Sequence, residues 1–179
     1  MHPNRPIVVV YGDPLPDELI RPLAVRGIGV VHPSRPSGVP DAGHIGALVV
    51  QVTPESVQGA VEPRACRRRT RSVLEDLARL VPAHCAIVLL VRNPGGADSN
   101  LYLVGVRAEL ARFRKRSARA LGVPAVVNAV IVPGAPDVDD LADRMAEFLG
   151  GPGGVSGEVV HSRSADSHLP ARTDSFREG

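Results

Sequence analysis

Asn100–Gly134 reads NLYLVGVRAELARFRKRSARALGVPAVVNAVIVPG and decides the fold that the rest of the chain must fit. Its first part has an apolar residue every three or four positions, which predicts a helix with one apolar face. This apolar stripe consists of Leu103, Val106, Leu110, Phe113, Ala118 and Leu121. Gly122 predicts the end of the helix, because glycine adopts the left-handed closing conformation without steric cost. Ala125–Val132 is apolar and β-branched, as expected of a parallel strand covered on both faces. A helix that leads directly into such a strand is half of a crossover unit.

The segments on both sides of this stretch repeat the alternation of strand and helix. Short apolar runs predict strands at Ile7–Tyr11, Ile28–His32, Ile45–Val52 and Ala86–Val91. Amphipathic segments predict helices at Asp17–Arg26, Pro54–Val81 and Asp137–Leu149. This order predicts an α/β, doubly wound, mostly parallel sheet. We expect one domain over residues 1–161 and a polar, flexible tail over residues 162–179.

The sequence of Asn100–Gly134 resembles that of a known family. Arg107-Ala108-Glu109-Leu110, Leu121-Gly122, Val127-Asn128-Ala129-Val130 and Pro133-Gly134 stand in this order and spacing. They resemble the pattern YxxxKAALxGLTRxLAxELGxxxxVNAVxPG of short-chain dehydrogenases/reductases. The resemblance extends from about Ile7 to His161 and implies a Rossmann-like domain whose final strand is Val155–His161. The family has a helix, a strand and a further helix between the second predicted strand and the third, and this chain has no room for them. The resemblance therefore implies a truncated fold.

The resemblance also implies where catalytic residues would stand, and all four positions are substituted. The family's tyrosine falls on Leu103 and its lysine on Arg107. Its serine falls on Arg92, and its asparagine falls near Glu62. Since an arginine cannot activate an absent phenol, we expect an inactive homologue with no catalytic residues.

The turn after the first strand argues against a nucleotide cofactor. In dinucleotide-binding folds this turn is rich in glycine, so that backbone amides approach a pyrophosphate. Here it reads Gly12-Asp13-Pro14-Leu15-Pro16, which adds a negative charge and removes two amide donors. We expect no cofactor.

Arginines crowd the two longest predicted helices, at positions 64–71 and 112–119. In the resembled family these two helices form the dimer face. The resemblance therefore implies a partner interface made of Arg64, Arg67, Arg68, Arg71, Leu103, Val106, Leu110, Phe113 and Arg114. Like charges on both helices would repel in a symmetric homodimer and suit a different, acidic partner. Solvated helix faces are the simpler alternative.

These observations together predict a non-catalytic subunit that pairs with an active short-chain ketoreductase and stabilises or shapes it. By resemblance, the complex belongs to fatty-acid or polyketide-type acyl thioester metabolism. An acidic acyl carrier protein is a further expected partner. The alternatives are an enzyme or a small-ligand-binding protein with a repurposed cleft near Arg92 and Arg107.

Composition narrows the remaining classes. The net charge of +2 and three Phe, two Tyr and no Trp do not favour a nucleic-acid-binding module. No apolar run approaches the roughly 20 residues of a membrane span, and Met1–Pro6 does not resemble a secretory signal, so we expect a cytoplasmic protein. The six histidines lack paired metal spacing. Cys66, among arginines, is either a reactive thiol or an inert helix residue.

Overall fold

The computed structural model of this chain describes residues 7–11, 15–31, 45–53, 63–80, 85–93, 99–122, 125–149 and 156–165. Its strands are β1 (Ile7–Tyr11), β2 (Gly29–Val31), β3 (Ile45–Val52), β4 (Ala86–Asn93), β5 (Val127–Pro133) and β6 (Val159–His161). Its helices are α1 (Asp17–Val25), α2 (Pro63–Leu80), α3 (Ser99–Leu121) and α4 (Val138–Leu149). These elements alternate along the chain as the sequence predicts.

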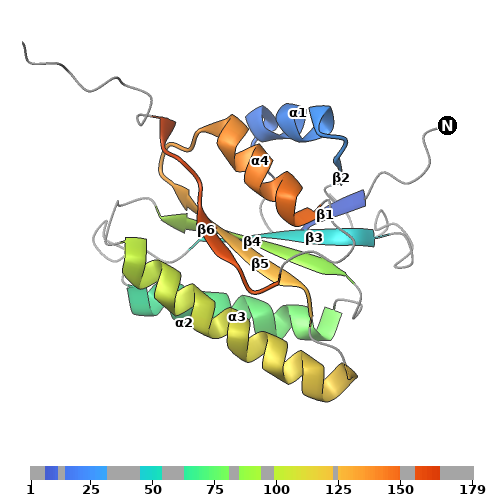
Figure 1. The fold of residues 1–179 in the computed structure, drawn as a ribbon, viewed down its shortest axis with the longest axis vertical. Helices are drawn as coiled ribbons and strands as arrows, with labels where there is room; N and C mark the ends of the chain where they lie inside the picture. Colours follow the sequence, from blue (N-terminus) through green and yellow to red (C-terminus); the bar gives the residue numbers. More distant parts are fainter. Residues whose placement is uncertain are drawn as a thin grey trace, which may run out of the picture.

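The described strands form one sheet of six parallel strands in the order β2-β1-β3-β4-β5-β6. Figure 1 shows α1 and α4 on one face of this sheet and α2 and α3 on the other. The predicted Rossmann-like, doubly wound fold is therefore confirmed. Its first five strands, β2-β1-β3-β4-β5, have the flavodoxin-like order, which is also what remains when strand 3 is removed from the order 3-2-1-4-5-6, and β6 adds a sixth strand at the edge. The strand order thus establishes the doubly wound architecture, but it does not distinguish a truncated Rossmann sheet from a flavodoxin-like sheet.

Two apolar cores follow from the alternation of side chains along the strands. On one face, residues such as Leu89, Val91 and Ile131 pack against α2 and α3. On the other face, Leu90 and Val130 belong to a second core, with α1 and α4. Both faces of the sheet are therefore closed by helices, which explains why the central strands are apolar at almost every position.

Among the crossovers whose helices the structure describes, one differs in hand from the rest. The chain passes from β1 to β2 over the α1–α4 face, and from β3 through β5 in the opposite direction over the α2–α3 face. A crossover that reverses both its direction across the sheet and the face that it covers keeps the same hand. The connection from β5 to β6 continues in the second direction but passes over the α1–α4 face, so its hand is opposite. Because about 98% of parallel crossovers are right-handed, β5–α4–β6 is the left-handed one. It places α4 beside α1 on the same face of the sheet.

Local signals explain where the elements end. Gly122 has φ +77°, the left-handed conformation that its position after α3 predicts. The Asp137 carboxylate accepts hydrogen bonds from the Asp139 and Asp140 amides at 3.1 and 3.2 Å, which caps α4. Asn128, buried in β5, accepts the Glu158 amide at 3.0 Å and fixes the approach to β6.

The predicted tail is wrong at its first residues. The Ser162 amide donates to the Ile131 carbonyl at 3.0 Å, and Ser162 is buried. The Arg163 amide donates to the Asp140 carboxylate at 2.8 Å, and Ser164 forms an antiparallel bridge with Pro136. Polarity alone suggested a tail, but these residues satisfy backbone groups beside α4. The remainder of the predicted tail, residues 166–179, lies outside the described residues.

Candidate functional site

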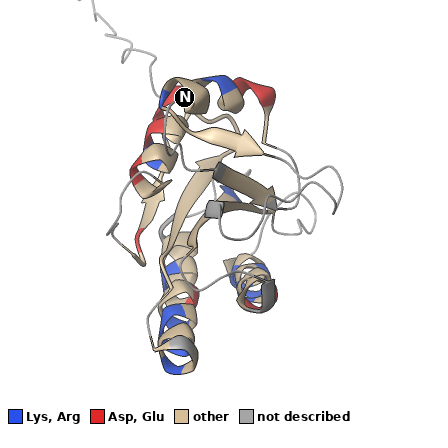
Figure 2. Ribbon diagram, turned by 90° about the vertical axis from the view of Figure 1, so that its right-hand side faces the viewer, with Lys and Arg blue, Asp and Glu red and all other residues tan. Residues whose placement is uncertain are grey.

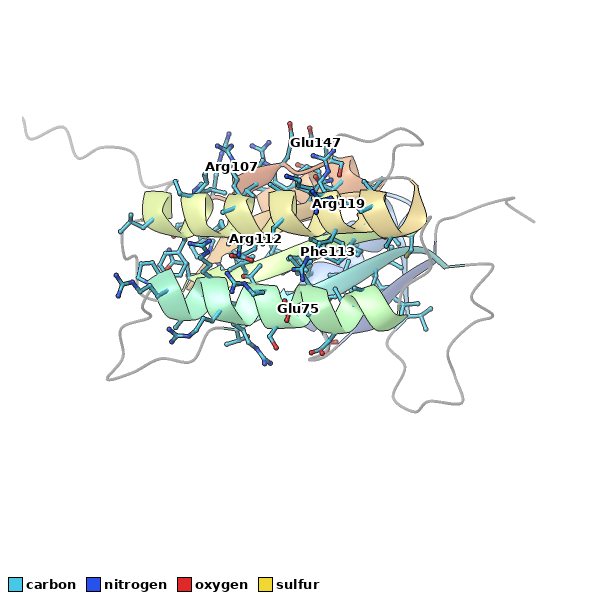
Figure 3. The ribbon with its side chains drawn as sticks, turned by 90° about the horizontal axis from the view of Figure 1, so that it is seen from below. Glu75, Arg107, Arg112, Phe113, Arg119 and Glu147 are labelled. Carbon is cyan, nitrogen blue, oxygen red and sulfur yellow. The ribbon has the colours of Figure 1, made fainter. Side chains whose placement is uncertain are left out.

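The structure does not gather the four family positions into one site. Leu103 is half-buried and packs against the core beneath α2 and α3. Arg107 is exposed on α3, and Figure 3 shows it on the side of α3 turned away from α2. Arg92 lies at the end of β4, on the opposite face of the sheet, and Glu62 lies outside the described residues. The predicted cleft shared by Arg92 and Arg107 is therefore wrong.

Arg92 instead lines a cavity of about 190 Å³ at the carboxyl ends of β3, β4 and β5. The sheet contributes Gln51, Leu90, Arg92 and Val132 to it. The first turns of α1 and α4 contribute Glu18, Leu19, Val138 and Leu141. In open α/β sheets, ligands bind outside the carboxyl ends of the strands. This cavity is therefore a candidate small-molecule site.

A buried carboxylate organises the other candidate, the surface of α2 and α3. Glu109 is only 1% exposed. The Nε atom of Arg67 donates to it at 2.7 Å, and Arg71 donates through Nε and Nη2 at 3.0 and 2.9 Å. Arg112, one turn along α3, contributes Nη1 at 3.2 Å. These hydrogen bonds tie α3 to α2.

The charge state of Glu109 follows from this arrangement. Hydrogen bonds from Arg71 lower its pKa most, and burial opposes them; with Arg67 and Arg112 also contributing, the pKa falls to about 2. The three guanidinium groups remain 41–49% exposed at the side chain, so each can still contact solvent or a partner. Glu109 is therefore an ionised anchor that holds three cations in place.

The charges around this anchor are strongly one-sided. The sequence of α2 contains six arginines and two acidic residues. That of α3 contains five arginines, one lysine and Glu109. In contrast, α4 has four acidic residues and one arginine. Figure 2 shows the basic residues on the α2–α3 side and most acidic residues on the α1–α4 side. The molecule is thus polarised across its sheet.

The predicted partner interface needs correction at its apolar residues. Val106, Leu110 and Phe113 are 0–6% exposed and pack under α2 and α3, so they cannot contact a partner. Helical periodicity identified an apolar face correctly, but the sheet of the same chain covers that face. The half-buried Leu103 contacts the same core.

The predicted arginines divide into groups. Arg64 and Arg68 are exposed. Arg67 and Arg71 are held by Glu109. Arg114 turns toward the start of β6, where its Nη1 would lie 2.7 Å from a Cβ placed on Gly157. Gly157 has φ +89°, so both its conformation and this close approach favour glycine.

Two surface residues that the sequence reasoning missed are apolar. Leu101 and Val104 on α3 are 55% and 64% exposed. They are followed along the outer side of α3 by Ala111 and Lys115, which are also exposed. The sequence did contain a signal for this exposed apolar surface, because the apolar residues 101, 104, 108 and 111 repeat at three- and four-residue steps out of phase with the buried stripe.

The structure gives less support to a reactive cysteine, a metal site or a membrane span. Cys66 is 1% exposed, and burial raises its pKa to about 11, so its thiol stays protonated. Burial likewise raises the pKa of Cys85 to about 11. Within the described ranges, no three His, Cys, Asp or Glu side chains are grouped to hold a metal ion. None of the described helices is long and apolar enough to cross a membrane.

No family model and no curated protein matches this sequence.

Proposed function

We propose that this protein is a non-catalytic subunit that pairs with an active short-chain ketoreductase through its α2–α3 layer. The observation that carries the proposal is the outer surface of this layer. It presents Leu101 and Val104 to solvent beside arginines of α2 and α3. Apolar residues surrounded by arginine are typical of protein interfaces.

Charge supports a partner that differs from this chain. Two copies meeting through the α2–α3 layer would bring like charges together, which costs several kcal/mol for close pairs, on the order of the whole gain from two exposed apolar side chains. An acidic face on the partner removes this cost. The three arginines around Glu109 are already ordered, so less side-chain entropy is lost when they bind.

The resemblance supports the class of partner and substrate. The positions of the family's catalytic tyrosine, lysine and serine hold Leu103, Arg107 and Arg92. The activity of the complex would come from the partner, acting on a β-ketoacyl thioester of fatty-acid or polyketide-type metabolism. An acidic acyl carrier protein would approach the same arginines by electrostatic steering.

The test is co-expression with an active short-chain ketoreductase, followed by light scattering and a ketoreductase assay. We expect a stable mixed complex whose activity disappears when the partner's tyrosine is replaced by phenylalanine. The matched variants are Val104→Asp and Val25→Asp, since both valines are exposed, at 64% and 79%, on helices of opposite layers. Val104→Asp should release the partner, and Val25→Asp should not. A chain that stays monomeric beside the reductase, or equal effects of the two variants, would contradict the proposal.

A further inference from the structure

The cavity at the carboxyl ends of the strands combines a cation, Arg92, with walls that are largely apolar. Leu90 and Val91 belong to the cores on opposite faces of the sheet, so Arg92, the next residue, returns to the α1–α4 face. There it lines the cavity together with Leu90 and Val132. Arg92 has no ion-pair partner within the described part of the chain.

A purely structural role does not explain why an arginine stands at position 92. It continues β4 by pairing with Val132, in a part of the strand that the sequence pattern places beyond the end of the apolar run. Arg92 is partly buried, and burying a charge without a partner is costly. An anionic ligand in the cavity would supply the missing partner.

The remaining wall restricts the chemistry of this ligand. Leu19, Leu141 and Val138 approach from α1 and α4 and give the cavity apolar sides. Glu18 is the acidic residue of the lining, so a ligand with two negative charges would be repelled and would lack a second cation. One negative charge attached to an apolar body fits both features.

The volume restricts its size. At about 190 Å³ the cavity holds roughly six water molecules at about 30 Å³ each. It lies below the roughly 300–1,000 Å³ of common ligand pockets, which excludes a dinucleotide. The occupant must therefore be a short molecule.

We propose that this cavity binds a small monocarboxylate, with its carboxylate on Arg92 and its apolar part against Leu90, Val132 and Leu141. Arg92 is a binding residue in this proposal, because a guanidinium group pairs with a carboxylate through two parallel hydrogen bonds. The site is independent of the partner surface on α2 and α3, which lies on the other face of the sheet.

The test is a titration of the full chain with hexanoate, followed by amide chemical shifts in two-dimensional NMR, with the neutral hexanol as the matched probe. We expect saturable shifts at the ends of β4 and β5 and at the start of α4 with hexanoate, and at least about tenfold weaker binding of hexanol, as expected when a hydrogen bond to a charged group is lost. Arg92→Met should weaken hexanoate binding by a similar factor. Arg107→Met, on the other face, should leave it unchanged.

Three results would overturn the proposal: no saturable shifts with hexanoate at millimolar concentration, equal binding of hexanoate and hexanol, or unchanged binding in Arg92→Met. The spectra also report whether Arg92→Met is folded. If that variant unfolds, the comparison of the two probes on the natural chain still decides.

Discussion

In each of the two helical layers of this protein, an ionic contact joins the two helices, and the two contacts have opposite arrangements of charge. In the α2–α3 layer, one buried acid, Glu109, joins the helices through three half-exposed arginines. In the α1–α4 layer, one base, Arg26, is 22% exposed at the side chain and joins the helices through two exposed acids, Asp139 and Asp143. In each of these two contacts, one inner charge is held by more exposed outer charges of the opposite sign.

This difference determines what each layer offers to solvent. The outer groups of these contacts are arginines in one layer and carboxylates in the other, so the two contacts present opposite charges to solvent. The two contacts also differ in environment, because Glu109 is 1% exposed, whereas the Arg26 side chain is 22% exposed and its two acids are 69–81% exposed. We therefore expect the α2–α3 contact to depend on pH and the α1–α4 contact to depend on salt.

The largest expected changes in the free energy of unfolding test whether the two helical layers and the sheet unfold as one cooperative unit. Leu110→Ala beneath α3 and Met145→Ala beneath α4 each remove a side chain that is 0% exposed. Each should lower the free energy of unfolding by about 3 kcal/mol, through lost burial and the cavity left behind. Val104→Ala, on the outer side of α3, should change it by less than about 0.5 kcal/mol. Guanidinium unfolding followed by circular dichroism measures all three.

The outcome of this first comparison also tests the correction to the predicted interface. If Leu110 contacted a partner rather than the sheet, Leu110→Ala would weaken the complex and leave the isolated chain almost as stable. Two separate unfolding transitions, each sensitive to only one of the variants, would show that the layers do not form one cooperative unit.

The next effect concerns the inner charge of the basic layer. Glu109→Gln should lower the free energy of unfolding by about 2 kcal/mol at neutral pH, because hydrogen bonds to a charged group are lost. The folded pKa, about 2, lies below the ordinary value of 4.5. This stabilisation is therefore complete above the unfolded pKa and is lost as the pH falls from about 4.5 to about 2.

The measurement is the unfolding free energy of both chains across this pH range. The natural chain should lose its advantage over Glu109→Gln as the solution is acidified, until the two curves meet. Glu75→Gln is the control, since Glu75 is 46% exposed and meets Arg116 across the same helices at 3.3 Å. A pH-independent difference between the natural chain and Glu109→Gln would show that Glu109 is not held ionised by its arginines.

The sequence was sufficient for the architecture because strands and helices leave local patterns. The apolar run at Ile45–Val52 coincides with β3. The start of α3 differs by one residue. The predicted end of the fourth strand at Val91 was two residues short, because Arg92 and Asn93 are polar yet continue pairing with β5. The helix predicted from Pro54 is described only over Pro63–Leu80.

The candidate site was harder to predict, because periodicity identifies an apolar face without saying what covers it. The stripe through Val106, Leu110 and Phe113 was assigned to a partner although the sheet covers it. Glu109 lies within this stripe, where an acid must be paired when buried. That position was the available signal for the arginine cluster. The cavity beside Arg92 depends on which face α4 crosses, and no local pattern records that choice.

The smallest expected effect concerns the acidic layer. The Nε atom of Arg26 donates to Asp143 at 2.7 Å, which lowers the pKa of that carboxyl group. Because Asp143 is exposed, solvent already stabilises its charge, and the pair gains little from folding. Arg26→Met should thus lower the melting temperature by less than Glu109→Gln does. Its effect should shrink further in about 1 M NaCl, where the Debye length is about 3 Å. The effect of Glu109→Gln should persist in the same salt, because its carboxylate is shielded from ions. If salt removed both effects equally, the inner charges of the two layers would be equally accessible, and the contrast between a buried acid and a solvated pair would not hold.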